Sequence, residues 1–382
     1  MKILAIDHLS CDPANRRIYD FISNRHGVNL KVIAPSNWIE NYKYYGNKNS
    51  DTLKIGYELI YLNNYFPGKP HLMFYTFKLY KIFKNFLPDI IYVNAEPENI
   101  LMLQVILFAK IYSPKSKIIF VTWRNIKYEL LNYPYKLQLI HRIVEKITYK
   151  FADACRSFNP TGKELLANAG FKKRIDVIPW GIDTDLYFFK NTEKKDSELT
   201  LGYVGRFVKP KGLEMIALAI YNLRKKYPVK GILVGDGPIK KDLLKTFDRL
   251  NISNHITIVN TVKGDEIVSW LHRMDIFLLP SYSTKKWKEQ FGRVLVEAMS
   301  AGIPVVGSSS GEIPWVIGNS GLVFREGDQL DMEEKISELI CDYKKRDSFS
   351  ILGRESVIKR FEIKLISERL LNFLGEILYE SK

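Results

Sequence analysis

Cysteine is scarce in this sequence, and its three copies, Cys11, Cys155 and Cys341, lie far apart and form no C-x-x-C pair. This argues against a disulfide framework and against a zinc ribbon, and it suits a reducing cytoplasm. Long apolar runs are missing as well. No stretch of about 18 uninterrupted apolar residues occurs, so the sequence predicts no membrane-spanning helix. The opening MKILAIDHLSC turns polar after a few apolar residues, and we expect a buried strand there rather than a signal peptide.

Acidic residues are sparse in the first half of the chain. Residues 1–190 hold 27 Lys and Arg against 16 Asp and Glu, a net charge of +11, whereas residues 191–382 carry +4. The densest basic stretch is 101–150, with 9 basic and 2 acidic residues. A basic half of this kind suits nucleic acid, anionic lipid or an anionic substrate, and charge alone does not choose among them.

The length and the apolar pattern predict two domains. A chain of 382 residues exceeds what one core usually supports. Strand-length, β-branched runs alternate with helical patterns, which predicts parallel sheets built from right-handed βαβ units. The expected strands of the first array are 2–7, 30–35, 89–94, 117–123 and 176–181, and those of the second are 199–205, 230–237, 255–260, 275–281 and 303–308.

The charged stretch 190–198 is expected to link these two arrays. We therefore predict an α/β fold of two Rossmann-like domains that face a central cleft at the carboxyl ends of their strands. The expected boundaries are 1–188 for the first domain, 189–360 for the second and 361–382 for a C-terminal helix.

The strongest local motif is EQFGRVLVEAMSAGIPVVGS, residues 289–308. It predicts a helix that begins near Gly292, where a phosphate can approach the first backbone N–H groups and the positive end of the helix dipole. Glu297, in the second turn, suits the two vicinal hydroxyls of a ribose. Taken alone, the motif is equally compatible with a buried helix that carries an ordinary N-terminal acid.

A second motif, GRFVKPKG, places Gly205 and Arg206 directly after an expected strand and Lys211 just before the next helix. Two cations at the carboxyl end of the first strand of a Rossmann domain can bracket a diphosphate. Basic residues near a turn often only face water. Together with the Glu297 helix of the same domain, however, these residues predict a nucleotide-diphosphate site.

These motifs, with LVGDGP and VIPWGIDTDLY, resemble the retaining glycosyltransferases of the GT-B fold, the group 1 or GT4-like class. The resemblance runs from residue 176 to residue 324. It implies that the C-terminal domain binds a nucleotide-diphosphate sugar (a UDP- or GDP-sugar), that the N-terminal domain binds a saccharide or lipid-linked acceptor, and that the last helix crosses back onto the N-terminal domain. It further implies sugar transfer to an acceptor hydroxyl in surface polysaccharide, lipopolysaccharide or glycolipid synthesis, with no cofactor, no metal ion and no nucleic-acid partner.

The resemblance also implies roles for single residues. Arg206 and Lys211 would hold the diphosphate, Glu289 the sugar hydroxyls of the donor and Glu297 the ribose, with Glu289, Arg206 and Lys211 as the catalytic group. The base would rest on the main chain of 261–263. The full donor-binding set is Gly205, Arg206, Lys211, Val262, Glu289, Phe291, Gly292 and Glu297, of which Phe291 and Gly292 would act through their backbone. The sequence offers no convincing enzyme nucleophile. The family resemblance suggests an ion-pair-like front-face mechanism, in which the leaving diphosphate takes the acceptor proton.

The N-terminal half departs from the family pattern. The loop SCDPANRR after the first strand lacks the glycines that many relatives have, and KIIFVTW leads into Trp123-Arg124-Asn125 where many relatives have a histidine. Glu96 and Glu98 directly follow the expected strand 89–94, a plausible position for binding residues, but a solvated helix start explains both acids at least as well. The acceptor-side candidates are Arg16, Glu96, Arg124 and Asn125.

The triplet Asp183-Thr184-Asp185 resembles a metal-binding D-x-D motif. It sits at the expected domain junction, where a turn or a helix N-cap is the simpler explanation. Oxygen-ligand metal sites usually need more converging acids.

Two other functions compete with sugar transfer as interpretations of the sequence. A nicotinamide enzyme needs G-x-G-x-x-G after a first strand, and neither SCDPANRR nor GRFVKPKG supplies it. A non-catalytic protein that binds membranes or nucleic acid through its basic half would leave the acid pair Glu289 and Glu297 unexplained.

The first half is also rich in aromatic residues, which suit a water–lipid boundary when lysines lie nearby. We therefore expect a cytoplasmic protein, peripheral on the inner face of an anionic membrane, that docks through residues 38–80 and 101–150. The alternative is that the aromatic residues fill a core. They are Trp38, Tyr42, Tyr44, Tyr45, Tyr57, Tyr61, Tyr65, Phe66, Phe74, Tyr75, Phe77 and Tyr80.

Overall fold

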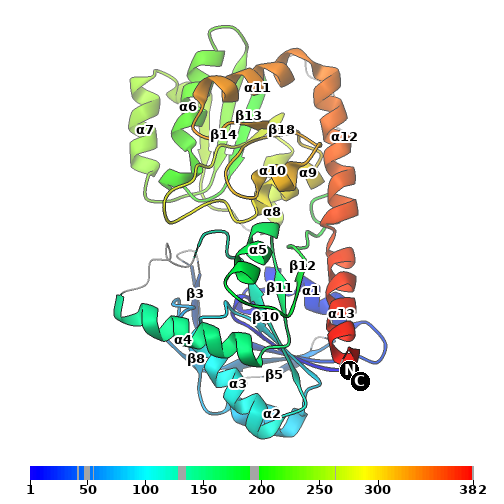
Figure 1. Ribbon diagram of the computed structural model, residues 1–382. Helices are drawn as coiled ribbons and strands as arrows, with labels where there is room; N and C mark the ends of the chain where they lie inside the picture. Colours follow the sequence, from blue (N-terminus) through cyan, green and yellow to red (C-terminus); the bar gives the residue numbers. More distant parts are fainter. Residues whose placement is uncertain are drawn as a thin grey trace. The chain divides into compact units, whose positions relative to one another are not determined.

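The computed structural model describes residues 1–40, 43–46, 52–54, 56–127, 135–189, 198–262 and 264–380. It divides the chain into two compact units (Figure 1). Unit 1 is Met1–Gly181 together with Ile363–Lys382, and unit 2 is Ile182–Glu362. All of the expected linker 190–198 except Glu198 lies outside the described residues, as do Tyr42 and Lys263.

Unit 1 is built on an eight-stranded sheet in the order β12-β11-β10-β9-β1-β2-β6-β5. All neighbours pair in parallel except the edge strand β5, which runs antiparallel to β6. Two small hairpins, β3 with β4 and β7 with β8, lie outside it. The strands are β1 (Lys2–Asp7), β2 (Asn29–Pro35), β3 (Trp38–Glu40), β4 (Lys43–Tyr45), β5 (Thr52–Lys54), β6 (Glu58–Leu62), β7 (Asn64–Tyr65), β8 (Phe74–Tyr75), β9 (Ile90–Asn94), β10 (Lys117–Thr122), β11 (Ala154–Ser157) and β12 (Arg174–Val177).

Side chains that alternate along the strands build one core on each face of this sheet. On β1, Leu4 and Ile6 enter one core while Ile3 and Ala5 enter the other. The first core is covered by α2 (Leu79–Phe86), α3 (Ile100–Tyr112), α4 (Tyr135–Phe151) and α5 (Pro160–Asn168). The second is covered by α1 (Arg17–Ser23) and α13 (Ile363–Tyr379).

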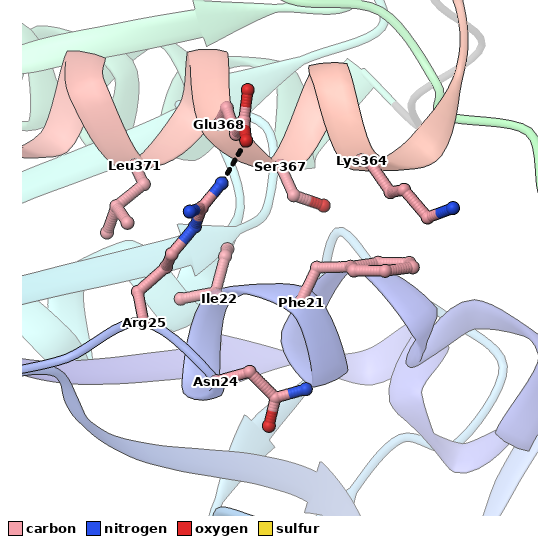
Figure 2. A pocket seen from close by; sticks show the side chains of 8 residues that line it. All are labelled: Phe21, Ile22, Asn24, Arg25, Lys364, Ser367, Glu368 and Leu371. Carbon is pink, nitrogen blue, oxygen red and sulfur yellow. Dashed lines mark hydrogen bonds and ion pairs between the residues drawn. The ribbon is translucent and has the colours of Figure 1, made fainter.

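The last helix, α13, is therefore part of unit 1, as the predicted fold class requires. It contributes Ile366, Leu370 and Phe373 to the second core. A hollow of about 230 Å³ lies between α1 and α13. The ion pair of Arg25 and Glu368 spans it (Figure 2).

Unit 2 holds a six-stranded, all-parallel sheet in the order β15-β14-β13-β16-β17-β18. The five expected strands of the second array form, and β18 is an additional one. The strands are β13 (Leu199–Val204), β14 (Val229–Val234), β15 (Ile256–Val259), β16 (Ile276–Leu279), β17 (Val305–Ser308) and β18 (Leu322–Phe324). The helices are α6 (Leu213–Leu223), α7 (Lys240–Arg249), α8 (Gly264–Leu271), α9 (Arg293–Ser300), α10 (Ile313–Ile317), α11 (Gln329–Cys341) and α12 (Tyr343–Arg360).

Unit 2 begins at Ile182, earlier than the expected boundary at 188. Ile182 forms a parallel bridge with Glu362, and the backbone carbonyl of Tyr187 accepts hydrogen bonds from Ser300 Oγ and Arg354. These contacts attach residues 182–187 to helices of unit 2. The chain therefore passes from unit 1 to unit 2 after Gly181 and returns to unit 1 after Glu362.

The aromatic residues of 38–80 do not form one lipid-facing surface. Trp38, Tyr57, Tyr61 and Tyr75 are buried in unit 1, so the expectation that they contact a membrane is wrong. Trp38 and Tyr75 belong to the first core of unit 1, and Tyr57 and Tyr61 belong to the second. Among the members of the group that the structure describes, Tyr44, Tyr65, Phe66 and Phe77 are exposed. In the part of the chain that the structure describes, no helix combines the length and apolar character needed to cross a bilayer.

A substitution on α13 tests its place in the core of unit 1. Phe373→Ala removes a ring that is 2% exposed and is expected to lower the free energy of unfolding by about 3–5 kcal/mol. Tyr379→Ala, on the same helix but 64% exposed, is the control and is expected to cost less than about 0.5 kcal/mol. Urea denaturation of the full-length protein, followed by tryptophan fluorescence, measures both. Equal losses for the two variants would contradict this assignment.

Candidate functional site

The first candidate site lies at the carboxyl edge of the unit 2 sheet. Strands β13 and β16 are direct neighbours, so the loops that follow them share this edge. Gly212 makes their close approach feasible, because it adopts the left-handed conformation (φ 69°) and a Cβ there would lie 2.1 Å from the carbonyl oxygen of Pro280. The loop after β13, which carries GRFVKPKG, is thereby packed directly on the loop after β16.

A buried ion pair joins these two loops. The Nζ of Lys211 lies 2.6 Å from the Oε2 of Glu289, and the Ser281 hydroxyl donates to the same oxygen at 2.7 Å. Both charged side chains are about nine-tenths buried, and the ring of Trp287 lies 5.4 Å from the Lys211 ammonium. The family resemblance assigns Lys211 to the diphosphate of a donor and Glu289 to its sugar. In the structure these two side chains are paired with each other.

Arg206, the second predicted cation, is exposed at the same edge. Its backbone carbonyl accepts the hydroxyl of the buried Tyr203 at 2.9 Å. Burial, with the nearby charge of Glu289 as a second cause, raises the pKa of Tyr203 well above its ordinary value. Tyr203 therefore stays neutral and anchors the turn at Gly205 and Arg206, which leaves the guanidinium at the surface.

Helix α9 begins where the sequence predicts, with Gly292 as its left-handed N-cap (φ 75°). The ring of Phe291 is buried against Phe361 and Trp315, at centroid distances of 5.5 and 6.1 Å. Because this side chain is committed to packing, a ligand at this helix terminus would meet the backbone of Phe291 and Gly292.

Glu297, predicted to bind a ribose, is buried in the second turn of α9. Its Oε1 lies 2.9 Å from the Nε of Arg293, and its carboxylate accepts the hydroxyl of Tyr187. Burial raises its pKa from the ordinary value, against the opposing effects of Arg293 and Tyr187. Val262, from the segment predicted to hold the base, is half-buried after β15, two strands away from β13 in the sheet.

A second polar cluster lies at the carboxyl edge of the unit 1 sheet. Asp7, at the end of β1, accepts hydrogen bonds from the Asn94 side chain at 2.6 Å and from the Tyr19 hydroxyl at 2.8 Å. The Nδ1 of the adjacent His8 lies 3.1 Å from the carbonyl oxygen of Asn94. These contacts tie the ends of β1 and β9 together.

Glu96 and Glu98 follow β9, and the interpretation that they start a solvated helix is wrong. Glu96 accepts the Thr122 hydroxyl and the backbone N–H of Trp123, both at 2.7 Å. The carboxylate of Glu98 is 1% exposed and lies 2.6 Å from the guanidinium of Arg124. Burial, followed by the charge of Glu98, raises the pKa of Glu96 to about 7. Glu98 is buried and Glu96 is half-buried, because Arg124 and the end of β10 supply their partners.

The other acceptor-side candidates also lie at this edge. Arg124 is buried and pairs with Glu145 of α4 at 2.9 Å in addition to Glu98, and Asn125 is buried next to it. Arg16 is buried as well, and its guanidinium donates to the Ser10 carbonyl at 2.7 Å and to the Tyr61 hydroxyl. Arg16 thus shapes the loop after β1, whereas Glu96, Arg124 and Asn125 meet at the ends of β9 and β10.

Several polar residues at these two edges were not singled out by the sequence analysis. They share one signal that could have revealed them, a polar residue at the carboxyl end of an expected parallel strand. These residues are Asp7, His8, Asn94, Thr122 and Ser281. Tyr187 and Arg293 gave no such signal, because their roles depend on contacts with Glu297.

The triplet Asp183-Thr184-Asp185 forms a turn. The Oδ1 of Asp183 accepts the backbone N–H groups of Asp185 and Leu186 at 3.1 and 3.3 Å. Within the described ranges, no group of three or more His, Cys, Asp or Glu side chains is arranged to hold a metal ion.

The family model of glycosyl transferases group 1 matches residues 184–356, which include the unit 2 edge described above. Residues 184–356 are a group 1 glycosyltransferase domain. The matched range begins and ends close to the limits of unit 2, so this glycosyltransferase domain is the unit that carries Arg206, Lys211, Glu289 and Glu297.

Comparisons with single proteins extend this finding. The chain is 28% identical over 234 residues to the capsular polysaccharide biosynthesis glycosyltransferase CapM of Staphylococcus aureus. The matched segment covers 58% of this chain and 60% of that relative. Among solved structures, sucrose-phosphate synthase from Thermosynechococcus elongatus superposes with a TM-score of 0.77 at 17% identity over the whole of both chains. The Anabaena protein Alr3699/HepE in complex with UDP gives 0.73 at 18% identity, over 98% of this chain and 100% of that one. Both units therefore have the fold of GT-B glycosyltransferases.

The half-buried carboxyl of Glu96, with its raised pKa, predicts a pH dependence of stability. Because its pKa rises from 4.5 to about 7 on folding, the folded state holds this proton more tightly. Stability is then lost as the pH rises from about 4.5 to 7. Glu96→Gln cannot ionise and is expected to remove this loss, so its stability relative to the wild type should rise by about 1–3 kcal/mol between pH 5 and pH 8. Urea denaturation at both pH values measures this.

The exposed Glu164 of α5 offers the matched control, because Glu164→Gln should follow the pH profile of the wild type. Parallel pH profiles for Glu96→Gln and the wild type would show that the pKa of Glu96 does not change on folding, which would contradict the prediction.

Proposed function

We propose that the protein is a retaining glycosyltransferase that moves a sugar from a nucleotide-diphosphate sugar to an acceptor hydroxyl. The observation that carries the proposal is the Lys211–Glu289 pair beside the N-terminus of α9, within a group 1 glycosyltransferase domain. A cation and a carboxylate thereby lie on adjacent loops of one sheet edge. A donor with a charged diphosphate and a hydroxyl-bearing sugar would need one group of each kind.

The cations of this edge would stabilise the leaving diphosphate. Lys211 and the exposed Arg206 oppose its negative charge, and the backbone N–H groups at Gly292 add the positive end of the α9 dipole. With these groups on the diphosphate we propose that no metal ion is needed. Lys211 would exchange part of its contact with Glu289 for the phosphate, while Glu289 accepts hydrogen bonds from the sugar hydroxyls.

Retention would follow from attack on the face that the diphosphate leaves. The bond between the anomeric carbon and the phosphate oxygen breaks, the acceptor oxygen bonds to the same carbon, and the acceptor proton passes to the departing diphosphate. The enzyme contributes charge and position to this step rather than a nucleophile.

For the acceptor we propose a saccharide or lipid-linked saccharide of surface polysaccharide, lipopolysaccharide or glycolipid synthesis. The name of CapM places that relative in capsular polysaccharide biosynthesis, which supports this class. Glu96, Arg124 and Asn125 are the groups of unit 1 proposed to receive it, with Arg16 shaping the neighbouring loop. We further propose that the protein works in the cytoplasm as a peripheral protein on the inner face of an anionic membrane.

A thermal-shift screen of the purified protein with UDP, GDP, ADP and their sugars tests the donor class. A ligand at 100 times its dissociation constant stabilises the folded state by about 2.7 kcal/mol, which such a screen detects. UDP is the first candidate because the similar Anabaena structure contains it. No shift with any nucleotide diphosphate or its sugar would refute the proposal.

Glu289 and Glu297 are expected to contribute to different steps, turnover and nucleotide binding. Glu289→Gln should reduce turnover strongly but leave the affinity for the free nucleotide unchanged or higher, because Lys211 loses the carboxylate that competes with phosphate. Glu297→Gln should weaken the nucleotide itself by about 1.5–3 kcal/mol, the value of a hydrogen bond to a charged group. Calorimetric titration with the nucleotide diphosphate, alongside a turnover assay, separates them. Equal losses of nucleotide affinity would contradict this division.

The two cations are expected to recognise the second phosphate. Arg206→Ala and Lys211→Ala should each weaken the nucleotide diphosphate by about 1.5–3 kcal/mol while changing the affinity for the monophosphate much less. Lys209→Ala, exposed in the same loop, is the matched control. Titration of each variant with both nucleotides measures the difference, and a loss shared equally by the two nucleotides would place these cations elsewhere.

A further inference from the structure

Helices α2, α3 and α4 form one layer of unit 1, on the face of the sheet opposite α1 and α13 (Figure 1). Their inward side chains, among them Phe83, Val105 and Val144, belong to the first core. The Lys110 ammonium of α3 lies 5.5 Å from the ring of Phe151 at the end of α4, so the outer surfaces of these two helices are adjacent. We call the outward surface of residues 77–87, 107–115 and 137–150 the helix-layer face.

Large apolar side chains are exposed on this face. Leu139 and Ile143, one turn apart on α4, are 67% and 50% exposed, and Phe77, just before α2, is 79% exposed. The full apolar group on the helix-layer face is Phe77, Leu87, Leu107, Ile111, Leu139, Ile140 and Ile143. Soluble proteins commonly expose single large apolar side chains. A group of them on adjacent helices indicates an interaction surface.

The charge on the same face is of one sign. Its exposed basic residues are Lys78, Lys81, Lys84, Lys110, Lys115, Arg142, Lys146 and Lys150. The one acid within these three ranges is Glu145, which is buried and paired with Arg124. The helix-layer face is therefore basic without acidic neighbours inside it, which is complementary to an anionic surface.

The arrangement on α4 favours a lipid surface over nucleic acid. Leu139, Ile143, Lys146 and Lys150 follow one another at intervals of three or four residues and so share one side of the helix. Aliphatic side chains gain free energy by entering acyl chains, while lysines beside them reach anionic headgroups. Nucleic-acid surfaces instead use aromatic stacking or hydrogen-bonding side chains between the cations.

We propose that the helix-layer face is the surface through which unit 1 docks on an anionic lipid bilayer, with α4 as its main contact. The inference deepens the peripheral-membrane part of the proposed function and moves the contact away from the buried aromatic residues of 38–80. It does not depend on sugar transfer.

Vesicle flotation of the full-length protein tests the proposal. Binding is expected to vesicles of phosphatidylcholine with phosphatidylglycerol, and to fall steeply from about 0.1 M to about 1 M salt, where the Debye length shrinks from about 10 Å to about 3 Å. Lys110→Gln, Lys146→Gln and Lys150→Gln combined should lower partitioning about 100-fold, at about fivefold for each lysine near an anionic leaflet. Leu139→Ser with Ile143→Ser should lower it about tenfold or more.

Unit 2 supplies matched controls with the same substitutions. Ile351→Ser with Ile358→Ser changes two exposed isoleucines of α12, and Lys225→Gln, Lys226→Gln and Lys241→Gln change three exposed lysines. Both controls should bind vesicles as the wild type does. Far-ultraviolet circular dichroism and nucleotide-induced thermal shift confirm folding of every variant and report on the proposed donor site separately.

Three results would overturn the proposal. The first is no binding of the wild type to anionic vesicles at low salt. The second is wild-type binding by both helix-layer variants. The third is displacement of the protein from vesicles by duplex or single-stranded nucleic acid at equal charge concentration, which would identify the face as a nucleic-acid surface instead.

Discussion

The ion pair between Lys211 and Glu289 is the contact on which the unit 2 edge depends. Two charges withdrawn from water cost several kcal/mol each, and their attraction compensates only when the geometry is good and further hydrogen bonds are made. The short contact and the Ser281 hydroxyl meet this condition. Removal of one partner would leave a buried charge, so the pair fixes the loops after β13 and β16 together. A ligand that supplies phosphate and hydroxyl groups could replace both halves of this contact at once.

The sequence predicts most of the architecture because strand periodicity is local. The strands around β1, β9 and β13 appear as apolar runs, and Gly292 signals the start of α9. By contrast, β11 reads ACRS, and nothing nearby shows that Arg156 is buried there. Its guanidinium is satisfied by the carbonyls of Ile178 and Pro179 and by Tyr92, partners that only the folded sheet brings within reach.

The same distinction separates the predicted from the unpredicted parts of the candidate sites. Position at a strand end is visible in the sequence, and it selects Arg206 and Lys211, whereas Glu289 is selected through the family resemblance. Pairing is not visible, since Lys211 and Glu289 are 78 residues apart. In unit 1 the sequence leaves Glu98 as either a solvated or a functional acid, and only Arg124, 26 residues later, decides that it is internal.

The location of α13 has a consequence for synthesis. Unit 2 is one continuous segment, whereas unit 1 needs Ile366, Leu370 and Phe373 to cover the second face of its sheet. On the ribosome, unit 2 can therefore form its complete core as soon as it emerges, while the earlier-made unit 1 still has an open apolar face beside Tyr19 and Ile22. The order of synthesis and the order of completion are opposite, so the nascent first unit is the state of this protein most exposed to aggregation and to chaperones.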